Sequence, residues 1–220
     1  MIDAVVKVGG SLGRGACLPE LGARLVELGR RYRLLVVPGG GVFADVVRQQ
    51  DEKFGLRPGT AHWMAVLAMD QYGHLLADLA PGCALVRTLG EAHAWLAHEG
   101  VAVLLPSEPL RHADALPHRW SVTSDSIAAW LTGQVGARLL VLLKDHHGMA
   151  SLAASAASAP PSVMTVAELA SSFGVDGHLA ELLAEPAFDL WIIDGERPER
   201  LIELLETGRT EGVRLARPGL

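Results

Sequence analysis

Lysine is scarce in this sequence, and several other features that would point to a function class are missing. The chain of 220 residues has three lysines, Lys7, Lys53 and Lys144, against 16 arginines. Its formal net charge of −6 argues against a general nucleic-acid surface, which needs clustered positive charge. The two cysteines, Cys17 and Cys83, form no C-x-x-C pattern, so the chain is not a disulfide-based scaffold.

Long apolar runs are also missing. The longest stretches, such as residues 139–143, are far too short to span a bilayer and end in charges. The first residues lack the basic start and apolar core of a signal peptide, which predicts a cytoplasmic protein. Half of the residues are nevertheless apolar, which is enough for a full hydrophobic core. We therefore expect residues 1–220 to form a single domain.

The apolar pattern alternates between strand-like and helix-like segments. Strands are predicted at 4–8, 33–37, 84–86, 101–105, 139–143 and 190–193, with a last one near Val213. Helices are predicted at 18–31, 42–50, 61–79, 92–98, 122–135, 166–171, 179–183 and 198–206. Residues 106–119 are expected to form a loop, and the low-complexity residues 150–162 a flexible connection. This order predicts an α/β fold, a three-layer αβα sandwich with a mainly parallel central sheet.

The first candidate for chemistry is Lys7 with the loop Gly9-Gly10-Ser11 that follows it. A glycine loop after a buried strand lets backbone N–H groups approach phosphate oxygens without obstruction by a Cβ atom. A lysine at the end of that strand places a cation where charge builds up during phosphoryl transfer. The alternative is a plain turn with a lysine whose head reaches solvent. The segment alone leaves both interpretations open.

A second glycine loop, Gly39-Gly40-Gly41, follows the next predicted strand. Open α/β sheets bind ligands at the carboxyl ends of their parallel strands, so two such loops favour a binding crevice there. The segment is neither a Walker A loop nor a dinucleotide-binding G-x-G-x-x-G fingerprint. A tight turn made of glycine is the alternative.

Two later segments place charged residues at helix and strand ends. Asp125 opens a predicted helix, where it is either a favourable first-turn carboxylate or holds Lys7 and Lys144 at one point. Lys144 and Asp145 end the most apolar strand of the chain, again at a carboxyl edge. The two histidines after Asp145 lack metal-ligand spacing, so we expect no metal site built from protein ligands.

These four segments occur in the order K-x-G-G-S, P-G-G-G, T-S-D-S-I-A-A and L-L-K-D-x-x-G, which resembles the amino acid kinase superfamily. The resemblance spans most of the chain, because residues 193–198 and 210–213 are similar to the family's closing strand. Within the superfamily, residues 62–73 and 116–130 resemble the kinases of tetrahydromethanopterin biosynthesis that act on [5-(aminomethyl)furan-3-yl]methyl phosphate. The resemblance implies transfer of the γ-phosphate of ATP to the substrate phosphate, with Mg²⁺ arriving with the ATP.

The resemblance also implies roles for parts of the chain and for single residues. Residues up to about 120 would bind the acceptor and residues from about 121 to 220 the nucleotide, in a homo-oligomer. The implied catalytic residues are Lys7, Asp125 and Lys144. The phosphate-binding residues would be Gly9, Gly10, Ser11, Gly39, Gly40 and Gly41, and the nucleotide-binding residues Lys144, Asp145 and Gly148. The substrate-binding residues would be His62, Asp70, Trp120, Thr123 and Ser124.

One departure from the family concerns a second catalytic lysine, which several members carry in a late glycine-rich stretch. No lysine follows Lys144, so either Lys144 or an arginine such as Arg197 supplies that charge, or the site is weakened. An aminomethyl group on the substrate would need an anion, for which we expect Asp70 or Asp114. Two alternatives stay open: a kinase for another small phosphate or carboxylate, such as isopentenyl phosphate, uridylate or acetylglutamate, and a non-catalytic nucleotide or oxyanion binder.

Overall fold

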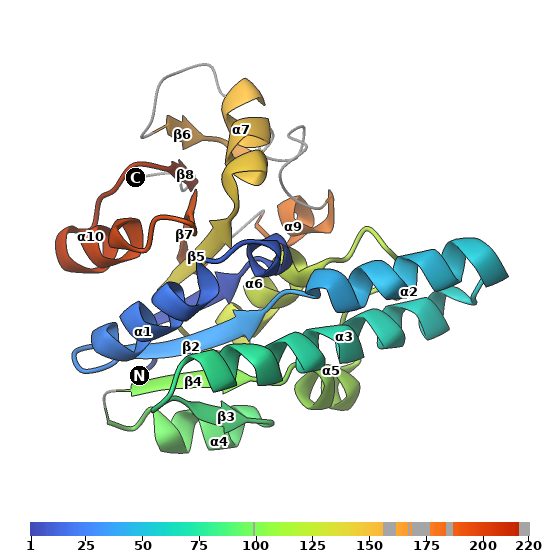
Figure 1. The fold of residues 1–220 in the computed structure, drawn as a ribbon, viewed down its shortest axis with the longest axis horizontal. Coiled ribbons are helices and arrows are strands. Elements are labelled where there is room, and N and C mark those ends of the chain that lie inside the picture. The colour runs from blue at the N-terminus through green and yellow to red at the C-terminus, as the bar shows by residue number, and fades with distance from the viewer. Residues whose placement is uncertain (99, 156–161, 167, 169–176, 184–186, 216–220) are drawn as a thin grey trace.

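The computed structural model describes residues 1–98, 100–155, 162–166, 168, 177–183 and 187–215. Its centre is an eight-stranded sheet in the order β3-β4-β2-β1-β5-β7-β8-β6 (Figure 1). Every neighbouring pair of strands is parallel except β7 and β8, which confirms the predicted mainly parallel sheet. The strands are β1 (Ala4–Val8), β2 (Arg33–Pro38), β3 (Ala84–Val86), β4 (Gly100–Leu104), β5 (Leu139–Lys144), β6 (Ser162–Met164), β7 (Asp189–Asp194) and β8 (Val213–Leu215).

Helices cover the two faces of this sheet. The helices are η1 (Gly10–Arg14, a 3-10 helix), α1 (Leu18–Leu28), α2 (Gly41–Phe54), α3 (Pro58–Leu79), α4 (Leu89–Trp95), α5 (Ser107–Ala113), α6 (Ser124–Val135), α7 (His146–Ser155), α9 (Gly177–Leu182) and α10 (Glu199–Thr207). One apolar cluster joins the sheet to α4, α5, α6 and α9, and a second joins it to α1 and α10. The predicted αβα layering is thereby confirmed.

Alternation along the strands divides the core between these two clusters. In β1, Val5 belongs to the cluster that α6 completes, whereas Val6 and Val8 belong to the cluster that α1 completes. Successive side chains of a strand point to opposite faces, so a continuous apolar run is what a sheet covered on both faces requires. Within such a run a charged residue such as Lys7 must point to one of the two helical layers.

The helices α2 and α3 lie side by side and extend beyond the sheet (Figure 1). Residue Gly55 ends α2 with a left-handed backbone (φ +61°), a conformation that glycine adopts without a steric penalty. Three residues later Pro58 begins α3, where a proline is tolerated because the first N–H groups of a helix need no partner inside it. This helical pair forms a wall beside the carboxyl ends of β1 and β2.

Two loop predictions were wrong in part. Residues 107–113 form α5, because Pro106 precedes the helix and Pro109 lies in its first turn, where a missing N–H costs nothing. Residues 150–155 belong to α7, an alanine-rich segment with high helix propensity, whereas 156–161 lie outside the described residues. The predicted helix at 166–171 also lies mostly outside them.

None of the helices in the described part of the chain is long and apolar enough to cross a membrane.

Candidate active site

Three charged side chains meet beneath the carboxyl ends of β1 and β5. The carboxylate of Asp125 lies 2.8 Å from Nζ of Lys7 through Oδ1 and accepts a hydrogen bond from Nζ of Lys144 at 2.5 Å through Oδ2. Lys7 and Asp125 are 4 % and 3 % exposed, respectively. Two of the three lysines of the chain are therefore held at one point by one carboxylate, which is the second of the two alternatives that the sequence left open for Asp125.

Strand alternation explains why these residues meet. Lys7 follows Val5 by two residues in β1, and Lys144 follows Leu142 by two residues in β5, so both lysines point to the face that α6 covers. The register pairs Lys7 with Leu142, which places Lys144 diagonally beside Lys7. Asp125 reaches them from the first turn of α6, where Thr123 caps the helix by accepting a hydrogen bond from the Asp125 N–H.

The two lysines set the charge state of Asp125. Burial by itself would raise the pKa of this carboxyl group, because the charged form loses its hydration. The positive charges of Lys144 and Lys7, together with their hydrogen bonds, outweigh burial and hold the pKa of Asp125 well below its usual range. Asp125 is thus an anion at neutral pH, and the cluster carries one net positive charge.

The two glycine loops touch each other beside this cluster. A Cβ atom on Gly10 would lie 2.2 Å from the backbone nitrogen of Gly41, and one on Gly39 would lie 2.5 Å from that of Gly10. A Cβ atom on Gly9 would lie 2.5 Å from the carbonyl oxygen of Leu143. Since no side chain fits at these positions, the loops after β1, β2 and β5 can approach one another only through glycine.

A buried tyrosine connects these loops to α3, a role that no motif in the sequence indicates. The hydroxyl group of Tyr72 donates a hydrogen bond to the carbonyl oxygen of Gly9 at 3.2 Å, and its ring packs against Gly13 and Gly41. Burial raises the pKa of Tyr72, so the phenol stays protonated and available as a donor. The periodicity of α3 marks Tyr72 only as one more apolar position.

Two helix N-termini open at the same edge of the sheet. Gly40 is the N-cap of α2, and Thr123 is the N-cap of α6, so the backbone N–H groups of both first turns lie near the lysine cluster. Such groups carry partial positive charge and bind anions. A third helix, α7, begins after Asp145, whose Oδ1 accepts a hydrogen bond from the Gly148 N–H at 2.9 Å. Together these features favour a binding site for phosphate groups.

A pocket of about 240 Å³ lies between α2, α3 and the segment that leads into α6. It begins at Gly40, Thr123 and Ser124 next to the lysine cluster and extends along α2. Of the five substrate-binding residues expected from the sequence, the pocket includes His62, Trp120, Thr123 and Ser124. The remaining lining residues are Ala44, Arg48, Asp51, Leu56, Pro58, Ala65, Val66, Met69, Arg119, Val122 and Ile127.

Asp51, Arg48 and Arg119 line this pocket although sequence reasoning did not select them. Nε1 of Trp120 donates a hydrogen bond to Oδ2 of Asp51 at 2.6 Å, and the guanidinium group of Arg48 lies 5.1 Å from the centre of the Trp120 ring. Arg119 lies 3.6 Å from Glu181 across the pocket rim. These contacts join residues far apart in sequence, so no local pattern could have indicated them.

His62 forms the inner wall of the pocket in a stack of aromatic rings. Its ring lies parallel to that of His118 at 4.5 Å, and Trp63 packs edge-on against both. His118 in turn bonds to Asp114 at 2.8 Å. Burial lowers the pKa of His62, and the neighbouring His118 lowers it further. His62 is therefore neutral at pH 7 and presents an aromatic surface rather than a charge.

The two carboxylates expected to face the acceptor lie outside the residues that line the pocket. Asp70 accepts a hydrogen bond from the Ser107 N–H at 3.1 Å and so stabilises the start of α5. Asp114 ends α5 with a left-handed backbone and bonds to His118 on the exposed side of the ring stack. Tertiary contacts thus engage both carboxylates away from the lining of this pocket, and the expectation that Asp70 or Asp114 faces the acceptor stays a prediction.

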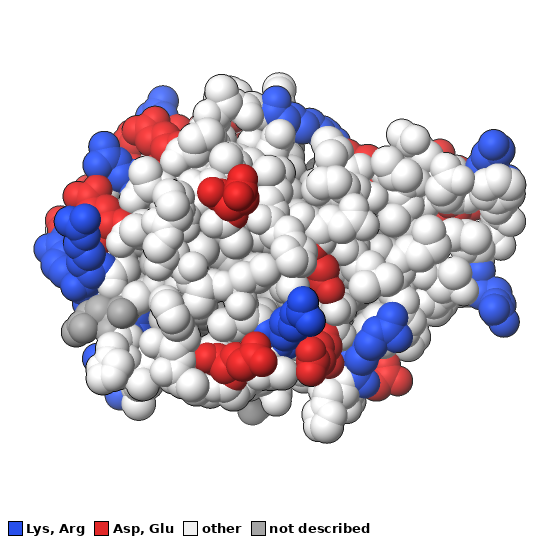
Figure 2. Space-filling model, turned by 60° about the horizontal axis from the view of Figure 1, so that its bottom comes forward, with Lys and Arg blue, Asp and Glu red and all other residues white. Residues whose placement is uncertain are grey.

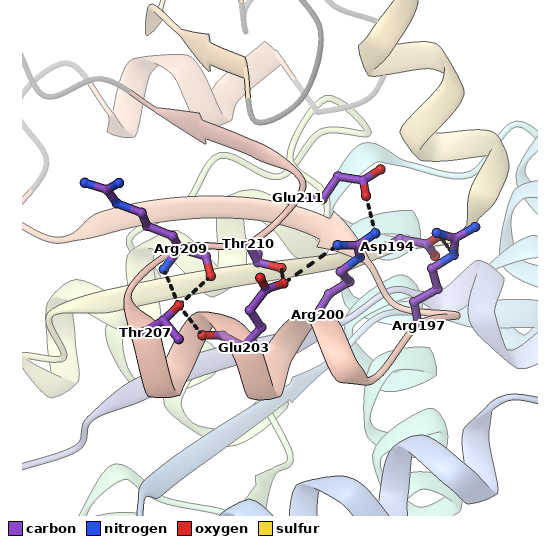
Figure 3. Close-up of polar contacts among 8 residues, drawn as sticks. All are labelled: Asp194, Arg197, Arg200, Glu203, Thr207, Arg209, Thr210 and Glu211. Carbon is purple, nitrogen blue, oxygen red and sulfur yellow. Dashed lines mark hydrogen bonds and ion pairs between the residues drawn. The ribbon is translucent and has the colours of Figure 1, made fainter.

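Arg197 lies at the same sheet edge as Lys144. The Gly195 N–H donates a hydrogen bond to the carbonyl oxygen of Lys144 at 2.8 Å, and Nε of Arg197 lies 3.6 Å from Oδ2 of Asp194 (Figure 3). Arg200, by contrast, is directed toward Glu203 and Glu211 (Figure 3). Arg197 thus follows the end of β7, the strand that pairs with β5, and its side chain is largely exposed to solvent.

Comparison with known proteins agrees with this geometry. The model of the amino acid kinase family matches residues 4–153. The chain is 26% identical over 202 residues to the [5-(aminomethyl)furan-3-yl]methyl phosphate kinase of Methanocaldococcus jannaschii, covering 92% of each chain. Among solved structures it is similar to the uridylate kinase of Archaeoglobus fulgidus, with a TM-score of 0.74, 17% identity and coverage of 98% and 100%. The UMP kinase of Ureaplasma parvum also has a TM-score of 0.74, with 13% identity and coverage of 99% and 100%.

These likenesses bear on different levels of the assignment. At 13% and 17% identity the solved structures establish the fold alone. The family model covers more than half of the chain and includes both glycine loops, Asp125, Lys144 and the segment that begins α7. The chain therefore belongs to the amino acid kinase family and is an ATP-dependent phosphotransferase.

Proposed function

We propose that this enzyme transfers the γ-phosphoryl group of ATP to the phosphate of [5-(aminomethyl)furan-3-yl]methyl phosphate, giving the diphosphate and ADP, in tetrahydromethanopterin biosynthesis. The observation that carries the proposal is the adjacency of two features. A buried cluster with net positive charge lies at two touching glycine loops, and a small, mainly apolar pocket opens beside it. The curated relative with this activity covers nearly the whole chain, which supports the choice of acceptor.

Each part of the cluster has a proposed task in the transfer. Lys7 contacts the transferred group and stabilises the charge that develops on its oxygens, while Gly9, Gly10, Ser11, Gly39, Gly40 and Gly41 provide backbone donors along the phosphate path. Asp125 holds the two ammonium groups in place. The acceptor oxygen is already ionised at pH 7, so the reaction needs no general base, and positioning with electrostatic stabilisation accounts for the catalysis.

We propose that the nucleotide lies on the side of Lys144, Asp145 and Gly148. Three observations support this placement: Lys144 ends β5, Asp145 caps α7, and Arg197 adds a cation at the same edge. Arg197 then supplies the charge that a late lysine supplies in other family members. The division into an acceptor part up to about residue 120 and a nucleotide part after it stays part of the proposal. Twelve of the 16 described residues that line the pocket precede residue 121, whereas Val122, Thr123, Ser124 and Ile127 follow it.

Magnesium is proposed to enter the site with ATP. Among the described residues no group of three His, Cys, Asp or Glu side chains could hold a metal ion. Mg²⁺ commonly keeps several of its waters and binds through substrate phosphates and one or two carboxylates. A site made by ATP and one or two carboxylates therefore suits Mg²⁺ better than a dedicated cage of protein ligands would. When bound, the ion would neutralise charge on the phosphate oxygens. Asp145 is the carboxylate nearest in sequence to Lys144 on the proposed nucleotide side.

The pocket favours a small acceptor over a nucleotide. Its volume of about 240 Å³ lies below the roughly 300–1,000 Å³ typical of pockets for drug-sized ligands. Aromatic and aliphatic side chains, including His62 and Trp120, line most of it and suit a flat heteroaromatic ring. Thr123, Ser124 and Gly40 mark the end at which the acceptor phosphate would face the lysine cluster.

A panel of phosphate acceptors tests the proposal. The purified enzyme is incubated with ATP, Mg²⁺ and, separately, the aminomethylfuran phosphate, isopentenyl phosphate or UMP, and products are identified by ³¹P NMR. We expect a diphosphate from the furan compound with the highest kcat/KM. Faster turnover of UMP or isopentenyl phosphate would reassign the acceptor, and ATP binding without turnover of any acceptor would favour a non-catalytic binding protein.

We further propose that the enzyme acts in the cytoplasm, where ATP is abundant, as a homo-oligomer. The side of the molecule that carries α3, β3 and α4 has a broad surface with few charges (Figure 2). These elements carry the exposed apolar side chains Leu67, Leu75, Leu85 and Trp95. Light scattering of the purified chain tests the oligomer, and a monomer at all concentrations would contradict it.

A further inference from the structure

Among the described residues that line the acceptor pocket, one side chain is acidic. Of the residues that line it, Asp51 alone carries a carboxylate, whereas Arg48 and Arg119 carry positive charges and His62 is neutral. Asp51 lies in the last turn of α2, at the other end of the helix from Gly40. The pocket is therefore polarised along α2, with phosphate-binding loops at one end and a carboxylate toward the other.

Neutral donors hold this carboxylate in place. Oδ1 of Asp51 accepts a hydrogen bond from the Leu56 N–H at 2.9 Å, and Oδ2 accepts one from Nε1 of Trp120 at 2.6 Å. A carboxylate offers about four acceptor positions, so each oxygen keeps capacity for a further donor. The two bonds come from the α2–α3 connection and from the segment before α6. Together they fix the direction of the group, which is what a specific binding site requires.

In the described part of the chain, Asp51 has no cationic partner. The nearby guanidinium group of Arg48 lies 3.2 Å from Asp45 and over the ring of Trp120 instead. Arg119, the other cation of the pocket, is directed toward Glu181. A partly buried carboxylate that is bonded only to neutral donors keeps its negative charge. Such a group is stabilised most by a cation that brings its own hydrogen-bond donors.

We propose that Asp51 recognises a primary ammonium group on the acceptor and thereby selects a cationic substrate; this rests on the proposed function. An acceptor that lies along α2 with its phosphate at Gly40 and Ser124 directs the group at its far end toward Asp51. The ammonium group donates to Oδ1 or Oδ2 while Leu56 and Trp120 keep their bonds. An aromatic ring between the two ends packs against the apolar lining.

The test compares two acceptors in two variants. The kcat/KM is measured for the aminomethyl acceptor and for its neutral hydroxymethyl analogue, in the wild type, in Asp51→Asn and in Glu52→Gln. Glu52 is the matched control, because it is the next residue of α2, is exposed and does not line the pocket. A charge-assisted hydrogen bond predicts a wild-type preference of about 10- to 100-fold for the aminomethyl compound.

Asp51→Asn should reduce this preference at least tenfold, whereas Glu52→Gln should leave it unchanged. If the role of Asp51 were merely structural, Asp51→Asn would lower both kcat/KM values together and leave the preference unchanged. An unchanged preference therefore overturns the inference about Asp51 and leaves the proposed function standing. Asp51→Ser, which keeps an oxygen near the Leu56 N–H, gives the same test if the asparagine variant does not fold. If neither variant folds, the ¹³Cγ resonance of Asp51 in the wild type should respond to the aminomethyl compound and not to its analogue, and equal responses overturn the inference. Absence of a diphosphate product from either acceptor in the wild type overturns the proposed function as well.

Discussion

At the ends of β1 and β5, the charges of Lys7, Asp125 and Lys144 are buried and paired with one another, and the glycine loops beside them leave no room for side chains. The pocket along α2 is different, because it is open, mainly apolar and contains single polar groups held by distant residues. In the first region almost every residue is constrained by its neighbours. In the second, a side chain such as Asp51 lines a cavity and is held by the Leu56 N–H and by Nε1 of Trp120. This difference explains how one family can keep a transfer chemistry while its acceptors vary.

The largest effect is expected from breaking the buried charge cluster. Asp125→Asn leaves the buried Lys7 and the partly buried Lys144 without a counter-charge, so we expect the free energy of unfolding to fall by about 3–5 kcal/mol at pH 7. Urea unfolding followed by circular dichroism measures this value. A loss below about 1 kcal/mol would mean that water, rather than Asp125, compensates the lysines.

The stability difference between the wild type and Asp125→Asn should also depend on pH. Because the pKa of Asp125 is lowered on folding, its stabilisation is complete above the unfolded value of about 3.9 and is lost as the pH falls through the lower, folded pKa. The stability difference between wild type and Asp125→Asn should therefore be constant from pH 5 to 7 and narrow below pH 4. A difference that widens on acidification would contradict the assigned charge state.

Removing the cation of Lys7 should raise the activation free energy of the transfer by nearly as much. In the proposed mechanism, Lys7→Ala takes away the fixed charge that stabilises the transferred phosphoryl group, so we expect kcat to fall by about 10²- to 10³-fold. Lys53→Ala is the matched control, because Lys53 is exposed and lies over the ring of Phe54. Steady-state assays at saturating ATP should separate the two variants, and equal kcat values would remove Lys7 from the mechanism.

The glycine contact offers a smaller, steric test. Gly10→Ala forces the two loops apart, because its Cβ atom would lie 2.2 Å from the Gly41 nitrogen, and should cost about 1–3 kcal/mol of stability as well as activity. Gly133 in α6 has nothing within 4 Å, so Gly133→Ala should instead stabilise the protein by about 0.5–1 kcal/mol. Thermal unfolding of both variants checks the opposite signs, and a neutral Gly10→Ala would show that the loops are not in contact.

The smallest effect is expected in the pocket. Trp120→Phe keeps an aromatic ring, although a smaller one, and removes the hydrogen bond to Asp51, whose loss should cost about 1 kcal/mol because water can reach a carboxylate that is only partly buried. The KM for the acceptor should rise while kcat changes little. A large fall in kcat with unchanged KM would place Trp120 in the transfer step instead.

The same contrast explains how much could be predicted from the sequence. The transfer centre was predictable because its constraints are local: a lysine inside an apolar strand, glycines at strand ends and a carboxylate in the first turn of α6 each leave a pattern in consecutive residues. Alternation along β1 and β5 then brings Lys7 and Lys144 to one face. The order of these segments made the fold predictable as well.

The pocket could not be predicted in this way. Asp51 meets Trp120 across 69 positions of sequence, and Asp70, which the sequence favoured as the anion, bonds to Ser107 across 37. Both are ordinary helix residues by their local patterns, and only the packing of α2 against α3 decides which one lines the pocket. The prolines of residues 106–119 predict a loop, yet residues 107–113 form α5, because a proline in the first turn of a helix is compatible with it.

The acceptor preference of Lys7→Ala tests most directly whether the charge cluster performs the transfer while the pocket selects the acceptor. The kcat/KM of this variant is measured with the aminomethyl acceptor and with its hydroxymethyl analogue. If the charge cluster performs the transfer and the pocket selects the acceptor, both values should fall by about the same factor and their ratio should equal that of the wild type. A ratio that changes tenfold in Lys7→Ala would contradict this account, because acceptor choice would then depend on the transfer centre itself.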